Sequence, residues 1–185
     1  MTNPMSSSES PKVLFEGRHV RLVKRGQWEY AERKSVTGIV GIVAVTDDGK
    51  LVLVEQYRPP VGRSVIELPA GLAGDDAAHE GEALEQAARR ELLEETGYEA
   101  ARMEYACAGA ASAGITSEII SMYLASGLRK TGPGAGDGSE KITVHEVPLD
   151  QVHPWLQQQA GLGKVVDLKV FAGMALIRDD KETRR

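Results

Sequence analysis

The chain has 185 residues, of which 42% are hydrophobic and 26% are charged. These values are typical of a soluble globular protein with a single core-forming domain. The net charge of −5 argues against nucleic acid or an anionic membrane as a partner, because both attract basic surfaces. One cysteine excludes an intrachain disulfide, and no apolar run is long enough to span a membrane. We expect a cytoplasmic protein whose residues 1–10 form a disordered polar tail.

Strand-like runs dominate the first third of the chain. Residues 12–23 and 27–34 alternate between polar and apolar around "KRGQ", which predicts a β-hairpin. Residues 37–45 and 50–57 are rich in β-branched side chains, and the "TDDG" between them predicts a second hairpin. The run 37–45 is apolar almost throughout, so we expect a central strand that is covered on both faces.

Helical and extended segments alternate in the rest of the chain. Ala, Leu, Glu and Arg dominate residues 82–96, and Gly97 follows as a C-cap would, so this segment is predicted to be a helix. We further expect strands near 102–108, 118–125 and 141–147, a glycine-rich loop over 131–140, a short helix after Pro148 near 149–159, and a packing helix over 165–178. This order indicates the α/β or α+β class, with a mixed sheet between helices.

The predicted helix carries an unusual arrangement of acidic side chains. At about 100° per residue, Glu91 and Glu95 fall within about 20° of Leu84, and Glu94 falls about 80° away. The glutamates therefore share the face of the apolar residues, whereas a solvated helix has its charges on the opposite face. Unpaired carboxylates on a body-facing surface are costly, so we expect a cation among them.

Arg90 is one candidate cation, because it can pair with Glu94 four residues later. It cannot neutralise all three glutamates. Oxygen ligands with no histidine or thiolate nearby suit Mg²⁺ or Mn²⁺, and Mg²⁺ is usually held by a few carboxylates together with substrate phosphates. We therefore expect Glu91, Glu94 and Glu95 to bind divalent ions. Like charges on one helix repel, so we also expect glutamine at Glu91 or Glu95 to leave the metal-free fold no less stable.

Residues 71–98 resemble the Nudix box of a known hydrolase family. In that pattern a glycine, five residues, a glutamate and seven residues precede a stretch that is matched here by "RELLEETGY". The second half fits throughout, since seven residues separate Glu82 from Arg90. The first half departs, because ten residues separate Gly71 from Glu82, which enlarges a loop where insertions are well tolerated. The resemblance implies an α/β/α sandwich and an enzyme that hydrolyses a nucleoside diphosphate linked to another group.

The flanking segments are similar to the ADP-ribose and nucleotide-sugar pyrophosphatase branch of this family. "LVLVEQYRPPVG", "ELPAGL" and "GSEKITVHEVPL" carry the likeness. It implies a homodimer formed by N-terminal strands at 11–35, ahead of a Nudix domain at 36–185. ADP-ribose enzymes commonly have Ser-Pro-Gly past the box, where this chain has alanine, Ala113, in place of the proline. The difference favours nucleoside diphosphate sugars, with an ADP-ribose-specific enzyme or a nucleoside triphosphate hydrolase as alternatives.

The resemblance also suggests individual roles for residues in the box and in the late loop. The metal ligands are expected to be the backbone carbonyl of Ala70 and the side chains of Glu91, Glu94 and Glu95, with Arg90 orienting a glutamate. Glu140 follows the glycine-rich stretch at an acidic position of the family's late loop, so it is the expected general base, with Asp137 as the alternative.

Substrate contacts are expected on other segments. Guanidinium geometry suits phosphate and ribose oxygens, which makes Arg58 a candidate. Glu67 opens "ELPAGL", and Trp28 and Tyr30 lie where this branch stacks its nucleobase, which can be across the dimer; core packing is the alternative for both aromatics. A non-catalytic Nudix-like module is a further alternative. Such modules usually lose glutamates of the box, and none is lost here.

Overall fold

The computed structural model of the protein describes residues 10–74, 78–134 and 141–183. Strands outnumber helices in these ranges, as the sequence predicts. In chain order the elements are β1 (Lys12–Glu16), β2 (Val20–Arg25), β3 (Trp28–Arg33), β4 (Gly38–Ala44), β5 (Lys50–Arg58), β6 (Arg63–Glu67), β7 (Ala70–Ala73), α1 (Leu84–Thr96), β8 (Tyr98–Ala110), β9 (Ile119–Lys130), β10 (Thr143–Pro148), α2 (Val152–Gly161), β11 (Val165–Val166) and α3 (Leu168–Thr183).

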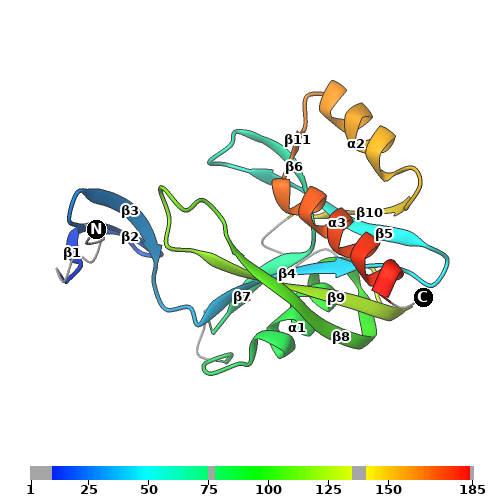
Figure 1. Cartoon of the computed structure of the whole chain (residues 1–185), viewed down its shortest axis with the longest axis horizontal. Helices are drawn as coiled ribbons and strands as arrows, with labels where there is room; N and C mark the ends of the chain where they lie inside the picture. The colour runs from blue at the N-terminus through cyan, green and yellow to red at the C-terminus, as the bar shows by residue number, and fades with distance from the viewer. Residues whose placement is uncertain (1–9, 75–77, 135–140, 184–185) are drawn as a thin grey trace.

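The first three strands form a small antiparallel sheet at one end of the molecule (Figure 1). The hairpin predicted around "KRGQ" is confirmed as β2 and β3, with Gly26 in the turn at a φ of 59°. The single run expected over 12–23 is divided into two strands, because the chain reverses where Gly17 N–H donates to Val20 O at 2.9 Å. The outer edge of β3 contacts the loop between β8 and β9, where Ala31 N–H donates to Ile115 O at 2.8 Å.

Two four-stranded mixed sheets form the body of the protein. Their strand orders are β7-β4-β9-β8 and β10-β5-β6-β11. In the first sheet β4 pairs antiparallel with β7 and parallel with β9, and its residues from Val40 to Ala44 are buried. The prediction of a central strand covered on both faces is therefore confirmed.

The second predicted hairpin is only partly correct. The "TDDG" turn forms, with Gly49 at a φ of 80° and Thr46 N–H donating to Lys50 O at 2.9 Å. Beyond one bridge between Val45 and Leu51, however, β4 and β5 separate into different sheets. The reason is that both edges of β4 are already occupied by β7 and β9, so β5 pairs with β6 and β10 instead.

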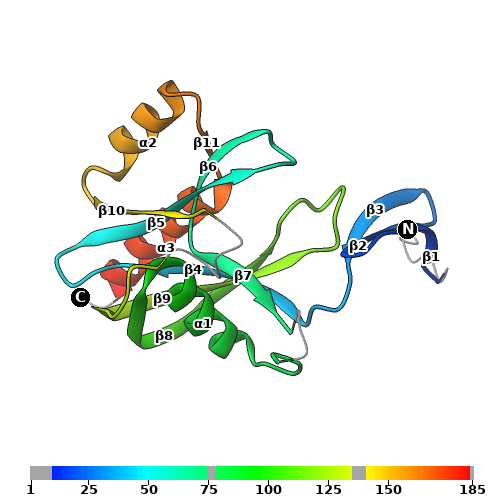
Figure 2. The same ribbon diagram turned by 180° about the vertical axis from the view of Figure 1, so that it is seen from behind.

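Helices cover the strands on two sides (Figures 1 and 2). Ala87, Ala88 and Leu92 of α1 pack in one core cluster with side chains of β4, β5 and β9. A second cluster joins α2 and α3 to the other side of the strands, and Leu51 and Leu53 of β5 belong to it. This layering confirms the predicted α/β/α arrangement with mixed sheets, preceded by antiparallel N-terminal strands.

Several boundaries differ from the sequence prediction. The strands expected near 102–108 and 118–125 extend to the longer β8 and β9. Pro148 ends β10, and α2 begins only at Val152. The last helix is preceded by the short strand β11, so it begins at Leu168. No helix in the described part of the chain combines the length and apolar character that crossing a bilayer requires.

Candidate metal and pyrophosphate site

The helix α1 carries the carboxylates of Glu91, Glu94 and Glu95, and its limits follow from local sequence. It begins at Leu84, two residues later than predicted, and ends at Thr96. Gly97 takes the left-handed conformation at a φ of 72°, and its N–H donates to Leu93 O at 2.8 Å. Glycine adopts this conformation without the steric cost of a Cβ, so the predicted C-cap is confirmed.

The three box glutamates differ in exposure. Glu95 is buried, with 5% of its surface exposed, and 14% of the Glu91 side chain is exposed. The Glu94 side chain lies at the rim with 42% exposed. The inward direction predicted from the helical wheel therefore holds for Glu91 and Glu95, whereas Glu94 faces solvent as its larger angular offset allows.

Glu91 and Glu95 both approach the beginning of β7. Ala70 N–H donates to Glu95 Oε2 at 3.1 Å. The Glu91 carboxyl group lies directly over Gly71, where a Cβ would come within 1.9 Å of the Glu91 carboxyl carbon. Only glycine at this position leaves room for the carboxylate against the strand backbone.

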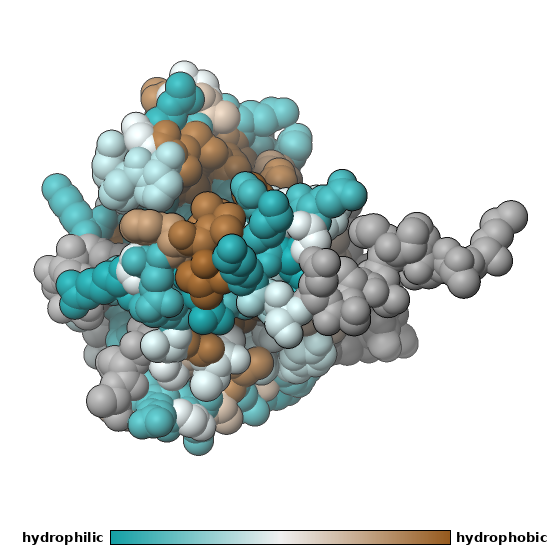
Figure 3. Space-filling view, turned by 90° about the vertical axis from the view of Figure 1, so that its left-hand side faces the viewer, coloured by the Kyte–Doolittle hydropathy of each residue, from teal (hydrophilic) through white to brown (hydrophobic). Residues whose placement is uncertain are grey.

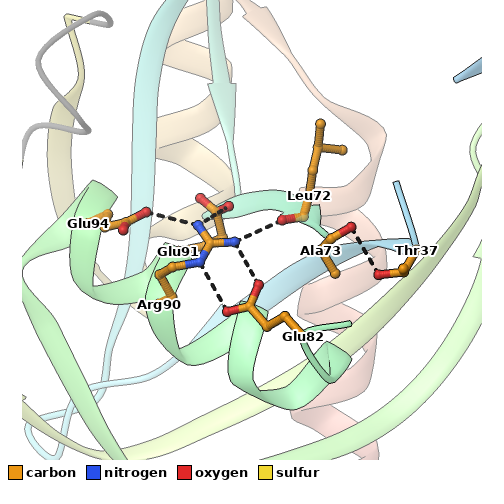
Figure 4. A network of polar contacts seen from close by, with 7 residues as sticks. All are labelled: Thr37, Leu72, Ala73, Glu82, Arg90, Glu91 and Glu94. Carbon is orange, nitrogen blue, oxygen red and sulfur yellow. Dashed lines mark hydrogen bonds and ion pairs between the residues drawn. The ribbon is translucent and has the colours of Figure 1, made fainter. Parts of the chain in front are cut away.

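Arg90 is the centre of a polar network (Figure 4). Its Nη1 donates to Glu91 at 2.7 Å and to Glu94 at 3.0 Å, which confirms the predicted pair with Glu94. Nε and Nη2 donate to the two carboxylate oxygens of Glu82 at 3.1 and 3.0 Å, and Nη2 also donates to Leu72 O at 2.8 Å. One guanidinium thus joins the acidic face of α1 to both ends of the enlarged loop.

The Arg90 guanidinium is positively charged in the folded protein. Burial alone would lower the pKa of Arg90, but the hydrogen bonds and charges of Glu82, Glu91 and Glu94 raise it far above its ordinary value. The arginine therefore compensates carboxylates that would otherwise repel one another on a half-buried helix face.

The donor set around Glu91 and Glu95 has the chemistry of a site for a hard divalent cation. Two carboxylates one helical turn apart face the backbone of Ala70 and Gly71, and the donors are oxygen atoms, as Mg²⁺ and Mn²⁺ prefer. Across the described ranges, no three His, Cys, Asp or Glu side chains are already grouped as a complete ligand set. Arg90 forms ion pairs with Glu91 and Glu94.

Arg58 and Glu67, two expected substrate contacts, bind each other. Arg58 Nε donates to Glu67 Oε2 at 2.7 Å across the neighbouring strands β5 and β6. The Glu67 side chain is 8% exposed and that of Arg58 is 36% exposed. Glu67 ends β6 three positions before Ala70, so the chain brings this pair next to the segment that receives Glu95.

Trp28 and Tyr30 occupy a different place. They line an open hollow of about 870 Å³ together with Ala113 and Gly114 of the loop between β8 and β9. The structure thus brings together Trp28, which is expected to stack on the nucleobase, and Ala113, which is expected to affect substrate preference. Figures 1 and 2 place β3 at one end of the molecule, away from α1, so Trp28 is not part of the carboxylate site within one chain. Glu140 and Asp137 lie outside the described residues.

Some residues of the site were not recognised from the sequence. In the sequence Glu82 is marked only by its spacing from Arg90, but it lies just before α1 and forms an ion pair with Arg90. The contact of Arg90 with Leu72 O has no sequence signal, because it depends on how the loop folds back. For Gly71 the sequence did contain a signal, because this glycine stands at the opening position of the box motif.

Comparison with known proteins agrees with this geometry. The family model described as NUDIX domain matches residues 37–167. "Methanol dehydrogenase activator" of Bacillus methanolicus is 37% identical over 153 residues, which cover 79% of this chain and 80% of that protein. "ADP-ribose pyrophosphatase" of Bacillus subtilis (strain 168) is 42% identical over 114 residues, or 61% of this chain and 59% of that protein.

A solved structure shares the fold. It is described as "Crystal structure of ADP compounds hydrolase" and matches 95% of this chain and 96% of its own chain, with a TM-score of 0.65 at 18% identity. The resemblance of the box and its flanks is thereby confirmed. The chain belongs to the Nudix family of hydrolases.

Proposed function

We propose that the protein hydrolyses the pyrophosphate bond of nucleoside diphosphate sugars in the presence of Mg²⁺, for which Mn²⁺ can substitute. The products are a nucleoside monophosphate and a sugar phosphate. The observation that carries the proposal is the pair of inward carboxylates, Glu91 and Glu95, against the backbone at Ala70 in a chain of the Nudix family. The names of similar proteins, which include an ADP-ribose pyrophosphatase, support hydrolysis of the same class of bond.

The metal ligands in this proposal are Glu91, Glu94, Glu95 and the carbonyl of Ala70. A bound divalent ion lowers the pKa of the attacking water and neutralises charge on the phosphate oxygens. Arg90 does not contact the substrate. Its hydrogen bonds restrict the rotation of the Glu91 and Glu94 carboxylates, of which that of Glu91 lies against β7, and so prepare them for the ion.

Glu140 is the general base in this proposal, with Asp137 as the alternative. Asp137 lies within the glycine-rich stretch 131–140, and Glu140 lies at its end. A carboxylate near the metals accepts the proton of the attacking water, which is the usual task of a positioned general base.

Substrate recognition uses Arg58, Glu67 and Trp28. The guanidinium of Arg58 is held in place by Glu67, and its planar geometry suits phosphate or ribose oxygens. Because β3, which begins at Trp28, lies at the end of the molecule away from α1, we propose a homodimer in which residues 11–35 carry Trp28 toward the site of the partner. A base stacked on Trp28 then lies beside the loop that contains Ala113.

The substrate preference depends on that loop. Proline would restrict φ at position 113, whereas alanine leaves the wall of the hollow freer, so strict selection for a terminal ribose is not expected. The name of the Bacillus subtilis relative favours the alternative of an ADP-ribose-specific enzyme.

A substrate panel tests the proposal. Purified protein is incubated with ADP-ribose, ADP-glucose, GDP-mannose and UDP-glucose, with Mg²⁺ or with EDTA, and the products are identified by mass spectrometry. We expect monophosphate and sugar phosphate only with Mg²⁺, and a kcat/KM for the hexose substrates at least comparable to that for ADP-ribose. A preference for ADP-ribose above about a hundredfold, near 2.7 kcal/mol in transition-state binding, establishes the alternative. Absence of turnover on the whole panel refutes the proposed function.

A further inference from the structure

The chain that leaves β9 packs against the carboxyl end of α1. Thr131 N–H and Gly132 N–H donate to Gly97 O at 2.8 and 3.3 Å. Gly134 then lies against the backbone of Glu95 and Thr96, the last residues of the helix. A segment remote in sequence is thus in direct contact with the residue that we propose as a metal ligand.

This contact is too close for any side chain. A Cβ at Gly134 would lie 2.6 Å from Glu95 O, 2.6 Å from Thr96 C and 2.8 Å from Thr96 Cα. All three neighbours are backbone atoms, so they cannot rotate away as the end of a flexible side chain can. Gly134 also has a φ of 71°, in the left-handed region that favours glycine.

Two other glycines of the chain, Gly132 and Gly163, lack this constraint. Gly132, two residues earlier, has open space where a Cβ would be and no positive φ. Gly163 has a φ of 87° but equally open surroundings. The requirement for glycine at position 134 therefore comes mainly from its contact with Glu95 and Thr96. Alanine at Gly132 tests the effect of reduced loop flexibility without such a contact, and alanine at Gly163 tests the effect of backbone strain without it.

Glu95 is held from two sides as a result. Its backbone carbonyl lies against Gly134, and its carboxylate accepts the hydrogen bond from Ala70 N–H at 3.1 Å. With only 5% of the residue exposed, there is little space in which the side chain can compensate for a shift of the helix end. A displacement at Gly134 must reach the carboxylate.

We propose that Gly134 is a positioning residue for the metal site: it allows residues 131–134, which follow β9, to pack on the end of α1 and so sets the position of the Glu95 carboxylate. This inference rests on the proposed function, because it takes Glu95 as a ligand. Gly134 touches neither metal nor substrate, and its effect on the reaction passes through Glu95.

Direct binding of Mn²⁺ to the full chain, followed by electron paramagnetic resonance, tests this role without relying on turnover. Gly134→Ala is expected to weaken Mn²⁺ binding by about tenfold or more, as is common when a residue that supports a metal ligand is changed. Gly132→Ala and Gly163→Ala are the matched controls and should bind Mn²⁺ like the wild type. Gly134→Asn serves as a second variant, because asparagine tolerates a positive φ but still adds the Cβ.

Each outcome decides the inference. Wild-type affinity in both position-134 variants overturns it, and so does global unfolding of both variants by circular dichroism, which would assign Gly134 a role in folding alone. Glu95→Gln separates the two proposals. If it binds Mn²⁺ as the wild type does, or if the wild type binds no Mn²⁺, the proposed metal site fails and the inference fails with it. If Glu95→Gln loses Mn²⁺ while Gly134→Ala retains it, only the role of Gly134 is refuted.

Discussion

Arg90 shows how one residue can organise an acidic helix face. Its guanidinium carries five N–H donors in a planar fork, and in this chain they serve Glu82, Glu91, Glu94 and Leu72 O. A lysine at this position has the same charge but no fork, so it could not bind a two-oxygen carboxylate and a carbonyl in these directions at once. Arg90 by itself therefore orients the carboxylates of the glutamates and joins the two ends of the enlarged loop.

Replacing the two inward glutamates tests the ligand assignment. Glu91→Gln and Glu95→Gln should abolish most Mg²⁺-dependent turnover, with the loss mainly in kcat, because negative ligand charge is removed where the ion must be held. The contact with Arg90 changes the stability expected for Glu91→Gln: the metal-free variant loses an ion pair and should unfold at lower urea concentration than the wild type. Near wild-type kcat at saturating Mg²⁺ in either variant would contradict its role as a ligand.

The identity of the general base is a second question at this scale. If Glu140 accepts the proton, Glu140→Gln should lower kcat by roughly 10²–10⁴ without changing the thermal unfolding curve. Asp137→Asn is the matched control, since it removes a carboxylate three residues earlier in the same segment. An active Glu140→Gln beside an inactive Asp137→Asn would move the role to Asp137.

At the scale of the elements, a polar cluster fixes α2 and the chain after it to the second sheet. Glu55 on β5 accepts hydrogen bonds from His145 of β10 at 2.9 Å and from Lys164 at 2.7 Å, and Lys164 also donates to Gln159 of α2 at 2.8 Å. Burial alone would raise the pKa of Glu55, but the hydrogen bonds from Lys164 and His145 lower it below its ordinary value. The ionised carboxylate is therefore favoured in the folded state.

This cluster predicts a pH-dependent contribution to stability. A carboxyl group whose folded pKa is lowered stabilises the fold above its unfolded pKa, ordinarily 4.5, and loses that effect as the pH falls through the folded value. Glu55→Gln should lower the free energy of unfolding by about 2 kcal/mol at pH 7, with a difference that shrinks below pH 4.5. Urea unfolding between pH 7 and pH 3 measures it. The exposed Glu29, 3.9 Å from Lys24, is the control, and Glu29→Gln should change little at any pH.

At the scale of the whole molecule, the N-terminal sheet stands apart from the body and exposes apolar side chains. Phe15 is 68% exposed and Trp28 is 54% exposed, and Val13, Leu14, Val20 and Leu22 are exposed on the same three strands. Figure 3 views the molecule from this end and shows hydrophobic side chains exposed among hydrophilic ones. An apolar surface of this kind usually marks an interaction site, which supports the proposed homodimer.

A charged side chain introduced on this apolar surface should dissociate the proposed dimer. Phe15→Glu is expected to convert the protein from dimer to monomer in sedimentation velocity at micromolar concentration. Turnover should fall with it, because Trp28 would no longer reach the partner's site. Leu168→Glu is the control, since Leu168 is 80% exposed on α3 and the variant should remain dimeric. A fully active monomeric Phe15→Glu would refute the contribution of Trp28 across the dimer.

Local patterns in the sequence determined much of the architecture. The helix over α1, its end at Gly97 and the buried strand β4 follow from preferences and periodicities that act within a few residues. The box spacing was likewise enough to identify the family. These features are readable because each depends on neighbours along the chain.

Only the tertiary structure decided which remote groups meet. It separated β4 and β5 despite their turn, brought Leu72 O and Glu82 to the same guanidinium, and placed Gly134 on the backbone of Glu95. Each of these contacts depends on the paths of segments far apart in sequence, which are set by competition for strand edges and core volume. No local pattern contains that information, so the sequence alone determined the chemistry of the carboxylates and the fold determined their positions.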